Sequence, residues 1–166
     1  ATISGPVVGN IAISQNAALG SVLAMSGDTL VAVAPMTSWG PRVVVYSVGN
    51  DELAETQSVI DSDLSAPECG GADLDLGSLG RSVALRGDTL LIGAPAAGDR
   101  GIVFVLERDG GPFACMGRLA PAEPKTGEQF GDALTLGDGI AVVSATANSD
   151  GAPAAADCDD ADGAGH

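Results

Sequence analysis

The sequence is poor in basic residues, aromatic residues and histidine. Of its 166 residues, 3% are aromatic, seven are lysine or arginine, and the single histidine, His166, is the last residue. A Ser-His-Asp or Cys-His catalytic system would depend on that final residue, so we expect no catalysis of this kind. The formal net charge of −15 repels phosphate backbones and anionic lipid, so we expect neither nucleic acid nor a membrane surface as a partner.

Several other signals are absent. No apolar run approaches the roughly 20 residues that a membrane-spanning helix requires. The sequence contains no G-x-x-x-x-G-K-[ST] phosphate loop, and no C-x-x-C pair of the kind found in zinc sites and thioredoxin-like proteins. The chain begins at Ala1 without an initiator methionine, so we expect a processed product from which a signal peptide has been removed.

Glycine and hydrophobic residues are abundant. The chain has 24 glycines and nine prolines, and 45% of its residues are hydrophobic. This composition is typical of a folded domain made of many short strands and tight turns.

An internal repeat is the strongest signal in the sequence. Leu19–Pro35 (LGSVLAMSGDTLVAVAP) aligns without a gap to Leu79–Pro95 (LGRSVALRGDTLLIGAP), 60 residues further on, and nine of the seventeen positions are identical. A third copy, FGDALTLGDGIAVVSA, begins at Phe130 and lacks the final proline. In the second half of the units, we align Val45–Val48 with Val103–Leu106, which makes Tyr46 and Phe104 equivalent residues of the repeat.

Each complete unit is predicted to contain four β-strands. Gly-Asp pairs mark two-residue hairpin turns between the first and second strands, because glycine readily adopts a positive φ. The second strand is apolar throughout, as in a strand buried on both faces, whereas the fourth is mixed, as in an outer edge. The predicted strands are Ser21–Met25, Thr29–Val33, Arg42–Val48 and Leu53–Ile60, then Ser82–Leu85, Thr89–Ile92, Gly101–Glu107 and Phe113–Leu119.

Four-stranded units that recur every 50 to 60 residues are what a β-propeller blade requires. The motif also resembles the FG-GAP repeat family in its bacterial form: Phe130-Gly131 supplies the FG and Gly93-Ala94-Pro95 supplies the GAP. The resemblance covers roughly residues 19–145. It implies an all-β propeller, secreted or at the cell surface, that takes part in adhesion or ligand recognition, with an extracellular protein or glycan as a candidate ligand.

The chain departs from this family in two respects. The calcium loop of integrin-type repeats is reduced to Gly27-Asp28 and Gly87-Asp88, too short to supply several oxygen ligands. The chain is also too short for a seven-bladed ring, so we expect an incomplete ring or one assembled from several chains. The predicted organisation is a propeller segment, 1–146, with blades at about 19–61 and 79–120, a half blade at 130–145 and an N-terminal strand at 2–14, followed by an acidic flexible tail, 147–166.

The three cysteines are Cys69, Cys115 and Cys158. Cys69 and Cys115 lie around the same repeat unit, and they form our predicted disulfide. The alternative is three buried thiols.

The acidic tail contains the candidate metal site. Four carboxylates cluster in D-C-D-D-A-D, which is similar to a metal-binding motif of bacterial secreted proteins, and Ca²⁺ takes six to eight oxygen ligands. A solvated acidic linker is the alternative. The candidate ligands are Asp157, Asp159, Asp160 and Asp162.

Trp39 is the candidate partner-binding residue. It lies in a Ser-Trp-Gly-Pro turn outside the repeat pattern, where it either anchors a partner or caps the blade. Arg86-Gly87-Asp88 spells a tripeptide presented by some adhesive ligands, although turn geometry already explains two of its three residues.

Three functions follow as expectations. The first is a structural or interaction module without catalysis, which assembles through blade edges with copies of itself or with the rest of a longer chain. The second is a calcium-dependent adhesion or ligand-binding module. The third is the propeller part of a larger secreted hydrolase.

Overall fold

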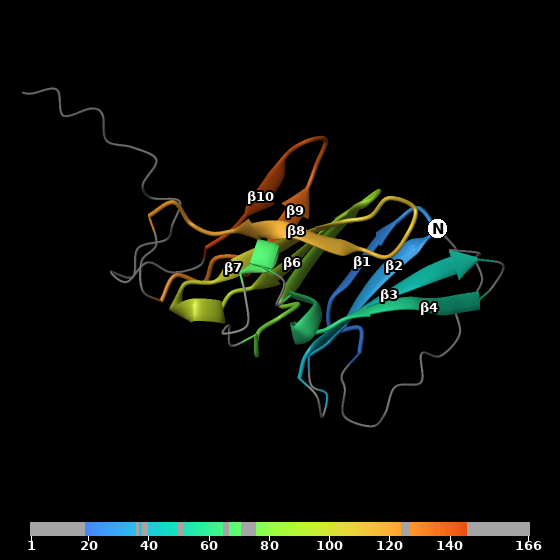
Figure 1. The fold of residues 1–166 in the computed structure, drawn as a ribbon, viewed down its shortest axis with the longest axis horizontal. Coiled ribbons are helices and arrows are strands. Elements are labelled where there is room, and N and C mark those ends of the chain that lie inside the picture. Colours follow the sequence, from blue (N-terminus) through green and yellow to red (C-terminus); the bar gives the residue numbers. More distant parts are fainter. Residues whose placement is uncertain are drawn as a thin grey trace, which may run out of the picture.

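The computed structural model describes residues 19–35, 37, 40–49, 52–64, 67–70, 76–123 and 127–145. Within these residues the fold is all-β: two four-stranded antiparallel sheets and a two-stranded hairpin, with three short 3-10 helices in the connections (Figure 1). No helix in the described residues has the length and apolar character needed to cross a membrane.

Both four-stranded sheets follow the chain in simple order, each strand pairing with the next. The first sheet contains β1 (Leu23–Ser26), β2 (Thr29–Ala34), β3 (Arg42–Gly49) and β4 (Glu52–Val59). The second contains β5 (Ser82–Arg86), β6 (Thr89–Ala94), β7 (Ile102–Glu107) and β8 (Ala114–Leu119). The hairpin is formed by β9 (Leu134–Leu136) and β10 (Ala141–Val143), and the 3-10 helices are η1 (Asp61–Leu64), η2 (Pro67–Cys69) and η3 (Ala97–Asp99).

All eight strands predicted for the two complete units are confirmed, with ends that shift by one or two residues. Gly27 and Gly87 have φ of 57° and 55° in the tight turns that join the first two strands of each sheet. A proline follows β2 and β6, where the strands end. The predicted half unit at 130–145 is the β9–β10 hairpin.

The burial pattern follows the predicted gradient from inner to outer strands. β2 and β6 are buried along nearly their whole length, whereas β4 and β8, the last strands in each sheet, are largely exposed. Both sheets carry a β-bulge at the same repeat position, between Val45 and Tyr46 in the first and between Val105 and Leu106 in the second. The two units therefore share even an irregularity of their strand pairing.

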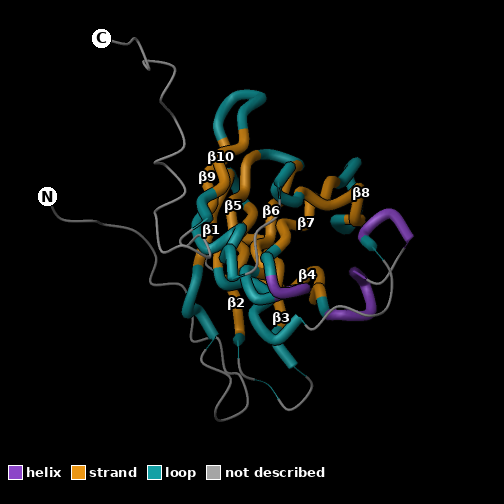
Figure 2. Tube along the Cα trace, turned by 90° about the vertical axis from the view of Figure 1, so that its left-hand side faces the viewer, coloured by secondary structure: helices purple, strands orange, loops and turns teal. Residues whose placement is uncertain are grey.

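The sheets stack face to face, and apolar side chains fill the space between them. One face of the first sheet and one face of the second form a single core cluster, which includes Val31, Val45, Ile92 and Phe104. The opposite face of the second sheet packs under the β9–β10 hairpin through Leu91 and other residues. Figure 2 shows β9 and β10 beside β5, on the side of the molecule away from β3.

The hairpin packs on the second sheet through the same kind of close glycine contact as the second sheet makes with the first. Gly80 lies against Val33 of the first sheet, where an added Cβ would come within 2.6 Å of a valine methyl group. Gly131 lies in the same way against Gly93, the residue 60 positions after Val33, with its added Cβ 3.4 Å from the Gly93 Cα. The backbone N–H of each of these glycines also donates to its own second strand, from Gly80 to Gly93 (2.9 Å) and from Gly131 to Ser144 (2.8 Å).

One predicted equivalence is wrong. Tyr46 pairs with Leu30, and the equivalent of Leu30 in the second sheet pairs with Leu106, so Tyr46 corresponds to Leu106 rather than to Phe104. The sequence alignment was shifted by two residues because a shift of two keeps each side chain on the same face of a strand. Tyr46 and Phe104 are nevertheless both buried, as expected for core aromatics.

Two predicted segments lie outside the described residues. These are the N-terminal strand at 2–14 and the acidic tail at 147–166.

Candidate interaction site

The residues predicted from sequence to bind a metal or a partner lie outside the described part of the chain. They are Asp157, Asp159, Asp160 and Asp162 for the metal and Trp39 for the partner. Among the residues that the structure describes, no group of three or more His, Cys, Asp or Glu side chains is placed to hold a metal ion. The candidate calcium site therefore stays a prediction from sequence.

The predicted disulfide between Cys69 and Cys115 is confirmed. It joins η2 to β8, with the two Cα atoms 6.2 Å apart. η2 lies against β8, the last strand of the second sheet, and Cys69 is fully buried. The disulfide thus holds the connection between the two sheets against an otherwise open sheet edge.

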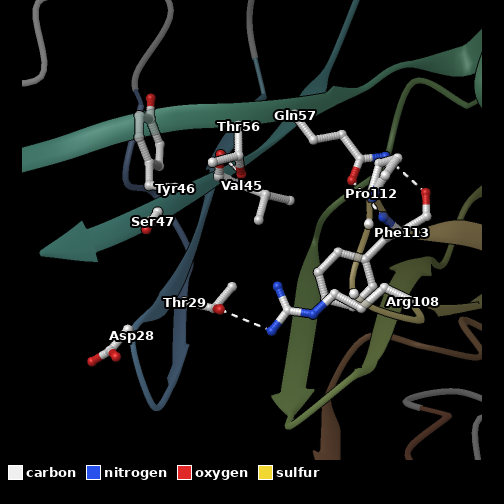
Figure 3. A pocket seen from close by; sticks show the side chains of 12 residues that line it. Asp28, Thr29, Val45, Tyr46, Ser47, Thr56, Gln57, Arg108, Pro112 and Phe113 are labelled. Atoms are coloured by element: carbon white, nitrogen blue, oxygen red, sulfur yellow. Dashed lines mark hydrogen bonds between the residues drawn. The ribbon is translucent and has the colours of Figure 1, made fainter.

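A pocket of about 420 Å³ opens between the two sheets (Figure 3). Its walls come from the β1–β2 turn, β3, β4 and the β7–β8 connection. The residues that line it are Asp28, Thr29, Val45, Tyr46, Ser47, Thr56, Gln57, Arg108, Gly110, Gly111, Pro112 and Phe113.

Arg108 spans this pocket and connects three parts of the fold. Its Nε donates to the carboxylate of Asp88 (2.8 Å), and one terminal nitrogen donates to the hydroxyl of Thr29 in the first sheet (3.0 Å). Its guanidinium carbon also lies 4.7 Å from the centre of the Phe113 ring, within the range of a cation–π contact. Since Arg108 already has these partners, its charge serves to join the sheets.

Gln57 makes a second connection across the pocket. Its side-chain nitrogen donates to the carbonyl oxygen of Phe113 (2.8 Å), and the Phe113 N–H donates to its side-chain oxygen (2.7 Å). One amide side chain thus satisfies both backbone groups of a residue in the neighbouring sheet, as a paired strand would. Gln57 and Arg108 therefore join the two sheets across this pocket. Both side chains already have hydrogen-bond partners within the protein.

Tyr46 lies on the other side of β3 from Arg108 and Phe113, as Figure 3 shows. Burial, reinforced by the negative charge of Glu55 and opposed by the positive charge of Arg42, raises the pKa of its hydroxyl. Burial disfavours the phenolate because a charged oxygen loses its hydration. Tyr46 is therefore a neutral core residue at physiological pH.

The Arg86-Gly87-Asp88 tripeptide forms the β5–β6 turn, as predicted. Both of its charged side chains have partners within the chain: Arg86 pairs with Asp138, and Asp88 pairs with Arg108. These ion pairs compete with any external ligand of the tripeptide.

An open surface lies on the hairpin that forms the third unit. Val142 is 56% exposed, although the residues at its repeat position, Leu91 and Val31, are 2% and 0% exposed. β10 pairs with β9 on one side, and no described strand pairs with it on the other, whereas β2 and β6 each have a partner on both sides. The third unit therefore presents both an unpaired strand and an uncovered apolar side chain.

A groove of about 570 Å³ lies beside this open strand, between the hairpin and the second sheet. Its floor is apolar. The groove is lined by Arg86, Gly87, Thr89, Leu91, Val105, Leu119, Leu136, Gly137, Asp138, Gly139, Ile140 and Ala141.

The sequence indicated the half unit but not this surface. The signal was present, because the alignment that places Phe130 on Leu79 also places Val142 on Leu91. Among the described residues, no third and fourth strand follow Val142 in its unit, and an apolar strand-two residue in this setting marks a surface that can take a partner. Arg108 and Gln57 were missed for another reason: their partners lie 79 and 56 residues away in sequence.

Comparison of the chain with known protein families found no matching family, and comparison with curated proteins found no match.

Proposed function

We propose that this protein is a structural and interaction module of the β-propeller type, related to the FG-GAP repeats, that assembles through the open edge of its third blade. Its two complete units are blades, and β9–β10 is the inner half of a third. It acts outside the cell or at its surface and carries out no catalysis of its own.

The observation that carries this proposal is the contrast between equivalent strands. Within the described residues, β2 and β6 are paired on both sides and covered on both faces, whereas β10 is unpaired on one side and Val142 is exposed. Unpaired strand edges with apolar neighbours bind further strands. Gly80 and Gly131 lie against equivalent residues of the preceding sheet, Val33 and Gly93. This equivalence supports the assignment of all three units to one repeating architecture.

Solution mass by light scattering tests the proposal. We expect the chain to form a defined multiple of its 16.3 kDa mass. Ala141→Pro should return it to a monomer, because proline lacks the N–H that β10 offers to a new strand. Met25→Pro is the matched control, since Met25 is an exposed residue on β1, the first strand of the first sheet, which is also an edge strand.

A folded monomer of the wild-type chain would contradict self-assembly. Repeating the measurement with calcium and then with a chelator tests the tail. Dissociation by the chelator would place calcium at the joint, whereas an unchanged mass would make the assembly independent of calcium.

A further inference from the structure

The outer edge of β10 offers backbone hydrogen-bonding groups to a new strand. Hydrogen bonds from Gly137 to Ile140 (2.7 Å) and from Ser144 to Ala133 (3.0 Å) fix which residues of β10 face β9. Because these bonds alternate along an antiparallel pair, the N–H and C=O of Ala141 and the residue two positions on point away from β9. In the second sheet, Leu90 holds the position of Ala141, and it pairs with Leu106 of β7.

The groove beside β10 is the space that a third and fourth strand fill elsewhere in the protein. In the first sheet, Val59 is 0% exposed because Phe104 and Phe113 of the next unit pack in the same cluster. Leu119 holds the position of Val59 in the second sheet, and it is 37% exposed at the edge of the groove. The groove is continuous with the described interface between the second sheet and the hairpin.

We propose that the open edge of β10 binds a β-hairpin of a partner polypeptide, which completes the third unit. This inference rests on the proposed function, in which the same edge is the joining surface. The first strand of this hairpin pairs antiparallel with β10, as β7 pairs with β6. It places apolar side chains, one of them aromatic, over Leu119 and Val105, and its second strand covers the outer part of the groove. This is strand addition combined with burial of alternate side chains.

The groove also specifies a basic residue directly after the first strand of the partner. Thr89 lines the groove at the position that Thr29 holds in the first sheet, where the Thr29 hydroxyl accepts a hydrogen bond from Arg108. Asp138 lies at the same end of the groove, near the position that Asp88 holds beside Arg108. Its carboxylate pairs with Arg86 through one oxygen, and the second oxygen can accept a further hydrogen bond. A lysine or arginine there would have both kinds of acceptor.

A separate polypeptide fits this surface better than a second folded copy does. Among the described residues, the chain has two hairpins with the required pattern, β3–β4 and β7–β8, and each is already paired within its own sheet. A second copy would have to open a sheet to donate either hairpin. Self-assembly through bare β10 edges pairs strands but leaves the groove unfilled, so a hairpin should displace the second copy.

The probe is a fluorescent peptide with the sequence of residues 101–120, in which serine replaces Cys115. It contains the β7–β8 hairpin and Arg108. We expect it to bind the full chain and to convert the oligomer into a one-to-one complex. Ala141→Pro and Leu119→Asp should each weaken binding by about tenfold or more, because the first removes a backbone donor of β10 and the second puts a charge at the edge of the groove, whereas Met25→Pro should not. A peptide with aspartate in place of Phe104 and Leu106 should not bind.

The outcomes separate the inference from the proposed function. If the peptide does not bind and the oligomer still depends on Ala141, the second copy is the occupant and the inference is wrong. If the wild-type chain is a monomer that binds the peptide through β10, the inference holds and self-assembly fails. Binding that is unaffected by Ala141→Pro would place the peptide elsewhere, and absence of both binding and assembly would overturn both proposals.

Discussion

The side chain of Gln57 forms two hydrogen bonds with the backbone of Phe113, one to its carbonyl oxygen and one from its N–H. Gln57 belongs to β4 of the first sheet, and Phe113 directly precedes β8 of the second. The joint between the sheets therefore depends on a polar side chain that the repeat does not reproduce, since Gly117 holds the equivalent position in the second sheet.

Replacing Gln57 by leucine should lower the free energy of unfolding by about 1–3 kcal/mol, because the Phe113 N–H and C=O lose their partner in a partly buried place. Urea denaturation measures the loss. Glu55→Ala on the same strand is the control, since it removes only an exposed ion pair with Arg42, which contributes about 1 kcal/mol or less. Equal losses for the two variants would show that the Gln57 bridge does not stabilise the joint.

Gly80→Ala should destabilise the protein by more than Gly87→Ala does. Both glycines have positive φ, 77° and 55°, so alanine at either position strains the backbone of the folded protein in the same way. An added Cβ at Gly80 would also lie 2.6 Å from a methyl group of Val33, whereas none lies near Gly87. We expect a further loss of about 1–3 kcal/mol from overpacking, measured by thermal or urea unfolding. Similar losses at the two positions would contradict the close stacking of the sheets.

Tyr46 should make stability fall at high pH. Burial raises its pKa in the folded state above the ordinary value of 10.0. The unfolded chain therefore loses the phenolic proton first. The stabilisation is fully present below the unfolded pKa of 10.0 and is lost as the pH rises through the folded pKa. Tyr46 is the only tyrosine in the chain, so the ultraviolet absorbance of the phenolate follows it alone.

Two variants check this pH dependence. Tyr46→Phe should remove the tyrosine contribution to the alkaline loss of stability. Glu55→Gln should lower the pKa of Tyr46, because it removes a nearby negative charge. A phenolate that titrates at its ordinary value in the folded protein would contradict the burial of Tyr46.

Loss of the Cys69–Cys115 disulfide should destabilise the protein by about 2–4 kcal/mol, because the unfolded chain gains conformational freedom. The double variant Cys69→Ser, Cys115→Ser should also release η2 from the edge of β8 and raise the tendency to aggregate. Unfolding and light scattering measure the two effects, and non-reducing peptide mapping checks the pairing. Cys158→Ser is the control. A peptide map that joins Cys158 to either partner would contradict the structure.

The repeated pattern made the strands predictable. Gly-Asp turns, Ala-Pro stops and apolar second strands are local signals, and each one acts within a few residues of the chain. Even β4 could be placed correctly, although Leu53–Val59 has some helical propensity, because its position in the repeat indicated a strand. The alignment that made Tyr46 equivalent to Phe104 was wrong by two residues, and it marks the limit of this approach. A shift of two residues keeps every side chain on the same face of its strand.

The sequence by itself determined the strand order, the turns and the presence of a half unit after Phe130. Only the tertiary structure decided that Arg108 and Gln57 join the sheets, that Val142 is exposed and that an unfilled groove lies beside β10. Strand formation and turn chemistry depend on neighbours in the chain. An unpaired strand edge or an exposed valine raises the free energy of the protein by an amount that depends on which distant segment packs against it. The stacking of the sheets determines which segment that is.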